Sequence, residues 1–272
     1  MNTARAIRGV RVAVSALFLT AVTLACIGPP AILLATSQHA VEVQLLPAIS
    51  AGSLAIFVAW VIVTLIFGRI YCSTVCPLGT LQDIIARLRR YRVYRYAQPH
   101  NKVAVAFLIA TLLAWALNIA AITRLLDPME EYRRVLTVAA LSPMWITLTA
   151  VILAATVAMA WKAGRLYCNT VCPLGSALAL VSRKSILHIE IDPDKCVRCR
   201  RCVDRCKAQC IDMDTLTVDN GRCVVCLNCL TAECPNDAIS YTANRHRLST
   251  PMFRPVAPAQ GDIAVNNVQP DK

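Results

Sequence analysis

The chain alternates between long uncharged apolar runs and short polar connections. Residues 12–35, 48–67, 103–122 and 135–161 contain no Asp, Glu, Lys or Arg. Each run reaches the roughly 20 apolar residues that a helix needs to cross a bilayer. The sequence therefore predicts an α-helical membrane protein with four transmembrane helices.

The first apolar run follows Arg5, Arg8 and Arg11, as the apolar region of a secretory signal peptide would. The run is longer than the roughly 7 to 15 residues of such a region, so we expect a helix that is retained. A lipoprotein modified at Cys26 is the alternative, which the residues before Cys26 fit poorly.

The basic residues of the connections predict the orientation of the bundle. Three arginines precede the first run and seven Lys or Arg residues lie within 68–102, whereas residues 36–47 contain none. Residues 123–134 hold three arginines, which three acidic residues offset. Because cytoplasmic connections carry the excess of Lys and Arg, both termini are expected in the cytoplasm.

A twelve-residue motif follows the second run and returns after the fourth. It reads GRIYCSTVCPLG over residues 68–79 and GRLYCNTVCPLG over residues 164–175, with ten of the twelve positions identical. Each half is thus two helices plus one motif, which implies a parallel repeat about the membrane normal. Both motifs are expected at the cytoplasmic surface.

Each motif carries the spacing Cys-x3-Cys-Pro. Pro77 and Pro173 suit the first turn of a helix, which would put Cys76 and Cys172 at N-caps. A helix N-terminus and a nearby arginine both lower the pKa of a thiol, so we expect thiolates. The alternative is that the cysteines only pack and the arginines only reach toward the membrane surface. The candidate cofactor-binding residues, as ligands of one further metal centre or as thiol pairs, are Cys72, Cys76, Cys168 and Cys172.

The composition fits a membrane protein, and it also shows that most of the cysteines are gathered in one segment. Of 272 residues, 57% are hydrophobic and 16% charged, against roughly 25% charged in soluble domains. The net charge of +12 comes from basic clusters beside the apolar runs, so nucleic acid is not an expected partner. Nine of the 14 cysteines lie between Cys196 and Cys234, a distribution that a secreted disulfide scaffold would not have.

Eight of these nine cysteines form two runs with iron–sulfur spacing. Two, two and three residues separate the cysteines of the first run, and two, two and four those of the second. In such pairs of runs the fourth cysteine of each ligates the other cluster. The expected ligands are Cys196, Cys199, Cys202 and Cys234 for one [4Fe–4S] cluster, and Cys223, Cys226, Cys229 and Cys206 for the other. Zinc is the alternative, but a zinc site does not need three such cysteines in succession twice.

The remaining features of this segment concern its local structure. Aligning Cys206 with Cys234 places Cys210 opposite Ala238, so Cys210 is expected to pack rather than ligate. Lys207 stands where such motifs usually carry proline. Strands are expected at residues 188–191 and 238–242, with a turn at 219–221.

The chain therefore divides into three predicted segments. Residues 1–187 are the four-helix transmembrane domain with the duplicated motif, and residues 188–245 are an α+β ferredoxin-like domain with two [4Fe–4S] clusters. Residues 246–272 are rich in proline and polar residues and are expected to be disordered.

The ordered combination of these motifs over residues 12–241 resembles the NapH/NosR-like family of membrane iron–sulfur proteins, in its compact NapH-like form. The four motif cysteines match the family's paired motifs, and the eight ferredoxin cysteines match its cluster ligands. The resemblance implies a multi-pass protein of the bacterial inner membrane that passes electrons between quinone or quinol and a redox partner, usually in anaerobic respiration. An electron carrier, such as the quinol-oxidising component of a complex, is expected rather than a self-contained catalyst.

Two other functions share these features. An assembly factor would supply electrons to a metalloenzyme or its metal cofactor during maturation. A redox sensor would need an effector domain, which the sequence does not show. Haem is not expected, because there is no Cys-x2-Cys-His and the histidines do not pair within spans; each is expected at the surface: His39, His100, His188 and His246.

Quinol oxidation also releases protons, so a quinol site needs a base within hydrogen-bond reach. The outer connections offer candidates, for which the alternative is ordinary solvated loop charge. These candidates are His39, Glu42, Asp127, Glu130 and Glu131.

Overall fold

The computed structural model describes residues 2–27, 54–88, 94–98, 100–117, 119, 125, 127–137, 142–232 and 234–243. Its helices are α1 (Asn2–Ile27), α5 (Leu54–Phe67), α6 (Tyr71–Thr74), α7 (Pro77–Leu88), α8 (Asn101–Ala116), α10 (Pro128–Leu136), α11 (Pro143–Ala163), α12 (Leu166–Thr170), α13 (Pro173–Ser182) and α14 (Arg201–Asp204). Its strands are β1 (His188–Ile191), β2 (Ile211–Asp212), β3 (Thr217–Val218) and β4 (Ile239–Thr242).

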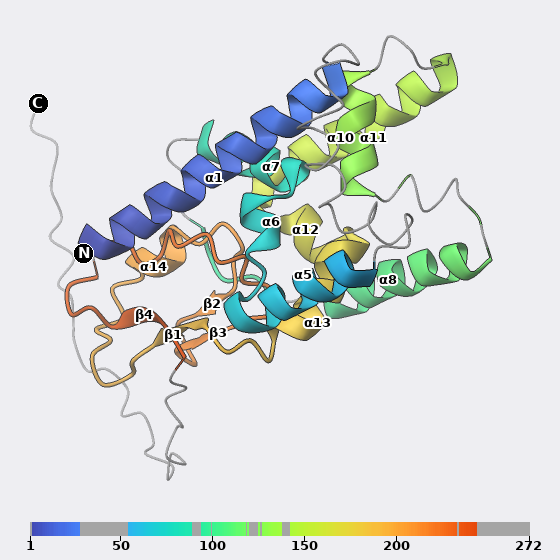
Figure 1. Ribbon diagram of the computed structural model, residues 1–272. Coiled ribbons are helices and arrows are strands. Elements are labelled where there is room, and N and C mark those ends of the chain that lie inside the picture. The colour runs from blue at the N-terminus through green and yellow to red at the C-terminus, as the bar shows by residue number, and fades with distance from the viewer. Residues whose placement is uncertain are drawn as a thin grey trace, which may run out of the picture.

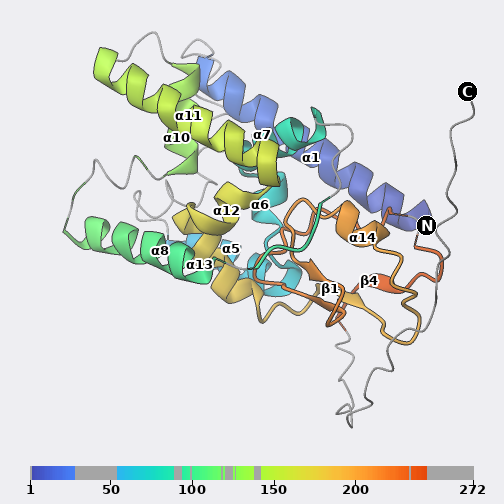
Figure 2. The same ribbon diagram turned by 180° about the vertical axis from the view of Figure 1, so that it is seen from behind.

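The helices form two groups on either side of the short helices α6 and α12 (Figures 1 and 2). One group contains α1, α7, α10 and α11, and the other contains α5, α8 and α13. Helix α7 of the first repeat packs on α11 of the second, and α13 of the second packs on α5 of the first. The two repeats are therefore interleaved, each with its motif helix against the other's long helix.

The motif sequence explains the shared turn of each repeat. Helices α5 and α11 are followed by Gly68 and Gly164, whose φ values of 74° and 65° are unfavourable for any residue with a Cβ. A short helix follows, and Pro77 and Pro173 begin the motif helices α7 and α13, where a missing N–H costs nothing.

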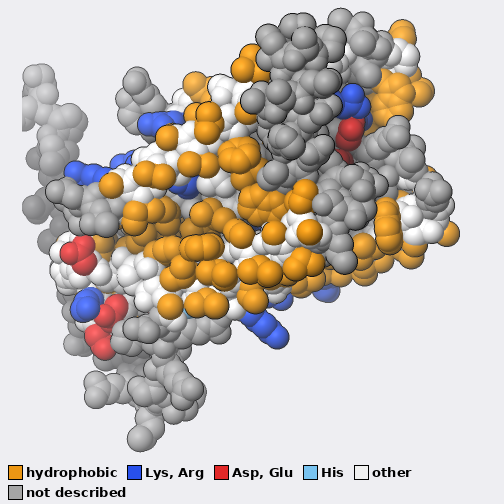
Figure 3. Space-filling model, in the orientation of Figure 1, with side chains coloured by type: hydrophobic (Ala, Val, Ile, Leu, Met, Phe, Trp, Pro, Cys, Tyr) orange, Lys and Arg blue, Asp and Glu red, His pale blue; other side chains and the backbone are white. Residues whose placement is uncertain are grey.

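Two helices are long and apolar enough to cross a membrane, α1 over Ala4–Leu24 and α11 over Pro143–Ala163. Only 11% and 17% of these stretches are buried. Apolar side chains cover much of the surface over the helical region (Figure 3), and such large exposed patches mark membrane or protein contacts. Shorter apolar helices occur at Val58–Phe67 and Asn101–Ala116.

The predicted fourth span begins later than the charge-free run indicates. Residues 135–161 lack charge, but α10 ends at Leu136 and α11 begins at Pro143, with Ser142 as its N-cap. The span therefore occupies only the later part of the charge-free run, because proline fixes a helix start that hydropathy does not register.

The C-terminal segment is a small unit of paired strands and the short helix α14 below α1 (Figure 1). Strand β1 pairs antiparallel with β4, with Ile191 opposite Ile239, and β2 pairs with β3. The expected flanking strands are confirmed. The expectation that His188 lies at the surface is wrong: it is 5% exposed in β1, and its Nδ1 lies 3.0 Å from the carbonyl oxygen of Ile186. The predicted disorder of residues 246–272, and the positions of His39, Glu42 and His246, lie outside the described residues.

Candidate metal centres

The eight cysteines with iron–sulfur spacing surround two separate cavities, each of about 330 Å³ including space open to solvent. Apolar side chains such as Ile191 and Met213 complete the walls of the first, and Ile189 and Leu227 those of the second. The first cavity is lined by Cys196, Cys199, Cys202 and Cys234; the second is lined by Cys206, Cys223, Cys226 and Cys229, with Cys210 beside them. The fourth cysteine of each run thus sits at the cavity of the other run.

The backbone around the two cavities repeats the same unusual conformation. The residues on either side of the middle cysteine have positive φ in both runs: Arg198 and Arg200 in the first, Val225 and Leu227 in the second. For a β-branched residue such as Val225 this conformation is an outlier, and it costs on the order of 1–3 kcal/mol. Strain of this kind persists where surroundings hold it, and successive turned N–H groups are a known cradle for Fe–S sites.

Backbone N–H groups point at the sulfurs of the fourth cysteines. The N–H of Ala238 donates to Cys234 Sγ at 3.3 Å. The thiol of Cys210, with Sγ 3.5 Å from Cys206 Sγ, and nearby backbone N–H groups lower the pKa of Cys206 although burial opposes this. Hydrogen bonds to sulfur stabilise thiolate ligands, so the donor set fits an iron–sulfur cluster in each cavity.

Cys210 is buried in the apolar core of the C-terminal unit at 1% exposure. It packs there, as the alignment with Ala238 predicted, and it also contacts the sulfur of Cys206. The contact between Cys210 and Cys206 was not predicted, because the spacing of cysteines along the chain does not show which sulfur atoms form a hydrogen bond.

The four motif cysteines gather in a third place. All are 4–6% exposed and belong to one buried apolar cluster: Cys72, Cys76, Cys168 and Cys172. Among the described residues, no group of three or more His, Cys, Asp or Glu side chains converges closely enough to hold a single metal ion. Their role as ligands of a further centre stays a prediction.

The expectation of thiolates at the N-caps is wrong for Cys76 and Cys172. Burial raises the pKa of Cys76, Cys168 and Cys172, and the neighbouring motif thiols raise it further. The N–H of Gly175 does donate to the sulfur of the N-cap Cys172 at 3.3 Å. That single donor does not outweigh full desolvation of the thiol.

The motif arginines connect the two repeats. Arg69 Nη2 donates to the carbonyl oxygen of Cys168 at 3.0 Å, and Arg165 Nη1 donates to that of Cys72 at 2.6 Å. Both arginines are at most 1% exposed, so the alternative that they only reach the membrane surface is wrong. The contact needs the last glycine of each motif: a Cβ on Gly79 would lie 2.7 Å from Arg165 Nη1, and one on Gly175 2.9 Å from Arg69 Nη2.

Asp83 joins three elements at one carboxylate. It pairs with Arg165 Nη2 at 2.8 Å, and with Arg11 of α1 and Lys207 of the C-terminal unit at 3.5 Å each. Burial opposes the charge of Asp83, but Arg165, then Lys207, outweigh it and hold its pKa well below the usual range. Sequence reasoning missed Asp83, because it lies outside the repeated motif.

Lys207 and its neighbours dock the C-terminal unit on the motifs. The carbonyl oxygen of Lys207 accepts the N–H of Arg165 at 3.0 Å, and that of Gly221 accepts from Arg69 Nη1 at 3.0 Å. Cys226 and Val224 belong to the same buried cluster as the four motif cysteines. The second cavity therefore lies directly beside the motif cysteines. Lys207, which stands where such motifs usually carry proline, supplies part of the contact between the C-terminal unit and the motifs.

Two of the outer-connection candidates are buried, so the alternative of solvated loop charge is wrong for them. Asp127 Oδ1 accepts the N–H of Met129 at 2.9 Å as the N-cap of α10, and burial raises its pKa to about 6. Glu131 is 0% exposed, neither carboxylate oxygen has a hydrogen bond, and burial raises its pKa. Arg134 Nη2 lies 3.7 Å from Glu131. Glu130 instead pairs with Arg133 at 2.8 Å and is partly exposed.

The chain is similar to known iron–sulfur proteins. A family model described as a 4Fe–4S binding domain matches residues 50–94 and 144–190, which contain both Cys-x3-Cys-Pro motifs. An uncharacterized protein of Methanocaldococcus jannaschii is 27% identical over 205 residues, 71% of this chain and 80% of the relative. No solved structure matches the chain.

Two relatives with descriptive names match shorter parts of their own length. The putative electron transport protein YccM of Escherichia coli is 25% identical over 70% of this chain and 55% of its own. The regulatory protein NosR of Pseudomonas aeruginosa is 27% identical over 64% of this chain and 25% of its own.

Fold, site and relatives together define a ferredoxin-type iron–sulfur protein that acts in electron transfer. Within that class, the chain is similar to the NapH/NosR-like 4Fe–4S proteins.

Proposed function

We propose that this protein carries electrons across the membrane surface between the quinone pool and a redox partner, as part of a respiratory chain. In this proposal the eight cysteines around the two cavities ligate two [4Fe–4S] clusters, which supply one-electron transfer when bound. The first cavity faces the partner, since Cys199 is exposed.

One observation carries the proposal: Cys226 of the second cavity shares a buried apolar cluster with the four motif cysteines. The cysteines therefore form a series from the exposed first cavity, through the buried second cavity, to the motif cysteines beside the long helices. Such an order suits transfer between a partner in the cytoplasm and a site in the bilayer.

The topology belongs to the same proposal. Helices α1 and α11 have the length to span, and the apolar α5 and α8 would complete four spans. Both termini and the ferredoxin segment of residues 188–245 would then lie in the cytoplasm, and residues 1–187 would form the membrane domain.

Glu131 is the residue we assign to accept a proton from quinol. Its carboxylate is buried without a hydrogen bond. Burial raises the pKa of Tyr167, and the nearby Cys172 and Glu131 raise it further. Burial makes the ionised carboxylate of Glu131 a stronger base than a solvated one, so in its ionised form it can accept a proton from quinol next to the motif cysteines. Oxidation of quinol to quinone would release two electrons, one to each [4Fe–4S] cluster, and two protons, the first to the ionised Glu131 and the second to solvent.

The test is reduction of the clusters by a short-chain quinol in proteoliposomes, followed by EPR of rapidly frozen samples. Glu131→Gln should slow quinol-driven reduction by roughly 10²-fold or more, and Glu130→Gln is the matched control that should not. Dithionite should reduce the wild type and both variants equally. Wild-type rates in Glu131→Gln would remove Glu131 from the mechanism. Clusters that dithionite reduces but quinol never does would favour an assembly factor with another electron donor.

A further inference from the structure

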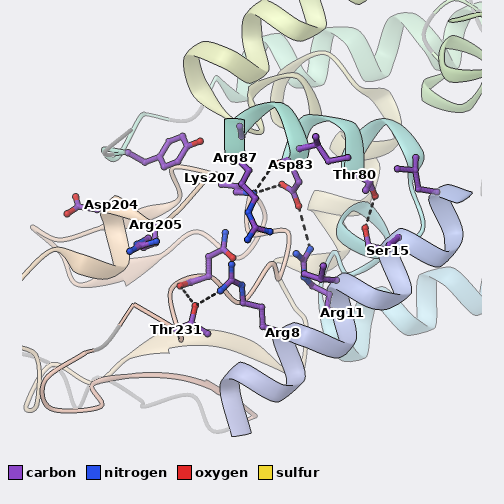
Figure 4. Close-up of a pocket in the computed structure, with 17 residues that line it drawn as sticks. Arg8, Arg11, Ser15, Thr80, Asp83, Arg87, Asp204, Arg205, Lys207 and Thr231 are labelled. Atoms are coloured by element: carbon purple, nitrogen blue, oxygen red, sulfur yellow. Dashed lines mark hydrogen bonds and ion pairs between the residues drawn. The ribbon is translucent and has the colours of Figure 1, made fainter. Parts of the chain in front are cut away.

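A pocket lies between α1, α7 and the C-terminal unit, apart from the two cysteine cavities, and encloses about 1210 Å³ including its open mouth. Figure 4 shows its side chains turned toward a common space from these three parts of the chain. Five lining residues are basic, namely Arg8, Arg11, Arg87, Arg205 and Lys207, and two are acidic, namely Asp83 and Asp204.

The charges of this pocket do not balance internally. Asp83 pairs with Arg11 and Lys207, but it is already paired with Arg165 from outside the pocket. Within the described part of the chain, Arg8, Arg87 and Arg205 form no ion pair with a carboxylate. Like charges held together in a partly buried site repel one another unless an anion joins them.

The arginines of α1 also retain unused donors. The Nε atoms of Arg8 and Arg11 are buried without a hydrogen-bond partner, and the Arg11 side chain is 8% exposed. Arg8 Nη1 reaches Thr231 Oγ1 at 3.3 Å. The guanidinium groups that line the pocket suit an oxyanion, because the guanidinium fork matches phosphate geometry.

Part of the lining that α1 and α7 contribute is apolar. It consists of Val12, Ala16 and Leu19 on α1 with Ile84 on α7. Val12 and Ile84 are 40% and 44% exposed, and α1 is long enough to cross a membrane. The apolar wall therefore continues the surface of a helix that would meet the acyl chains of the bilayer.

We propose that this pocket binds an anionic phospholipid, with the phosphate among Arg8, Arg87 and Arg205 and an acyl chain along Val12, Ala16 and Ile84. Basic pockets between helices at a cytoplasmic membrane surface bind acidic headgroups in this way. A neutral ligand would leave the arginines uncompensated. The phosphate would tie α1, α7 and the C-terminal unit to one another, next to the loop that carries Cys226 and Cys229.

The experiment uses the full chain with its clusters assembled anaerobically and its lipids removed in a neutral detergent. Phosphatidylglycerol, phosphatidylcholine or inorganic phosphate is then titrated in, while the thermal midpoint and lipid retention in native mass spectrometry are followed. Phosphatidylglycerol should bind saturably and raise the midpoint. Arg8→Gln and Arg87→Gln should each weaken this binding by about tenfold or more, at unchanged iron content.

Arg95→Gln is the matched control, because Arg95 is an exposed arginine outside the pocket, and it should bind the lipid as the wild type does. Equal stabilisation by phosphatidylcholine would overturn the proposal, since that lipid has no net charge. Binding of inorganic phosphate as tight as that of the lipid would overturn the assignment of the apolar wall. Full affinity in both pocket variants would overturn the site itself.

Discussion

Arg165 donates a hydrogen bond of 2.6 Å to the carbonyl oxygen of Cys72, the first motif cysteine of the other repeat. The reciprocal bond runs from Arg69 to the carbonyl oxygen of Cys168 at 3.0 Å. The two repeats are therefore locked by a pair of buried arginines, and the duplicated GR…CPLG motif encodes that lock.

Replacing Arg165 should lower the stability of the protein, because Arg165 neutralises the buried carboxylate of Asp83. Arg165→Gln leaves Asp83 with weaker partners and should destabilise the protein by about 3–5 kcal/mol. Adding Asp83→Asn should restore part of the loss, because the orphaned carboxylate is gone. Thermal unfolding of the single and double variants in detergent measures the coupling. Strictly additive losses would contradict a direct Arg165–Asp83 interaction.

The motif glycines should tolerate no methyl group. Gly79→Ala and Gly175→Ala place a Cβ against an arginine and a cysteine carbonyl, and such overpacking costs about 1–3 kcal/mol. Gly9→Ala is the control: nothing lies within 4 Å of its Cβ, and alanine favours a helix by roughly 0.5–1 kcal/mol. Chemical unfolding should thus move in opposite directions for the two kinds of variant, and a common direction would argue against the close approach.

Asp127 should make stability depend on pH. Burial raises its folded pKa to about 6 from 3.8, so the folded state binds more protons than the unfolded state between these values. Stability from this group is therefore full below pH 4 and is lost as the pH rises toward 6. Asp127→Asn keeps an N-cap and should remove this loss, with a gain of about 1–3 kcal/mol at pH 7. Unfolding at pH 4.5 and 7 checks it; an equal effect of the variant at both pH values would contradict the raised pKa.

Replacement of Cys210 distinguishes a packing role of this cysteine from a role as a cluster ligand. Cys210→Ala should retain the full iron content, because Cys210 is not one of the eight expected ligands. It should shift the potential of one cluster to a more negative value, since a hydrogen bond to Cys206 is lost. Redox titration followed by EPR measures the shift. Loss of about four iron atoms instead would make Cys210 a ligand.

The strands, the helix starts and the arrangement of the cysteine runs could be predicted from local sequence patterns. The strands at 188–191 and 239–242 follow from alternation and turn residues, and the crossed arrangement of the cysteine runs follows from the ligand pattern. The turn after α5 and α11 and the prolines of α7 and α13 could likewise be read from one repeat.

Long-range contacts could not be read in the same way. Asp83 lies 82 residues from Arg165 and 124 from Lys207, and no periodicity links them. The thiolate prediction failed because it counted the helix N-terminus and the arginines, which the sequence displays, but not the desolvation that only the packed core imposes. Glu131 was recognisable as an acidic residue, whereas its complete burial in α10 was not.

Anaerobic iron and sulfide analysis of the full chain, combined with an EPR-monitored redox titration, tests the central claim most directly. We expect about eight iron and eight sulfide per chain from the two cubanes, in two reducible centres. Cys199→Ser should affect one centre and Cys226→Ser the other. Zinc without sulfide, or a chain whose iron yields no reducible signal, would contradict it.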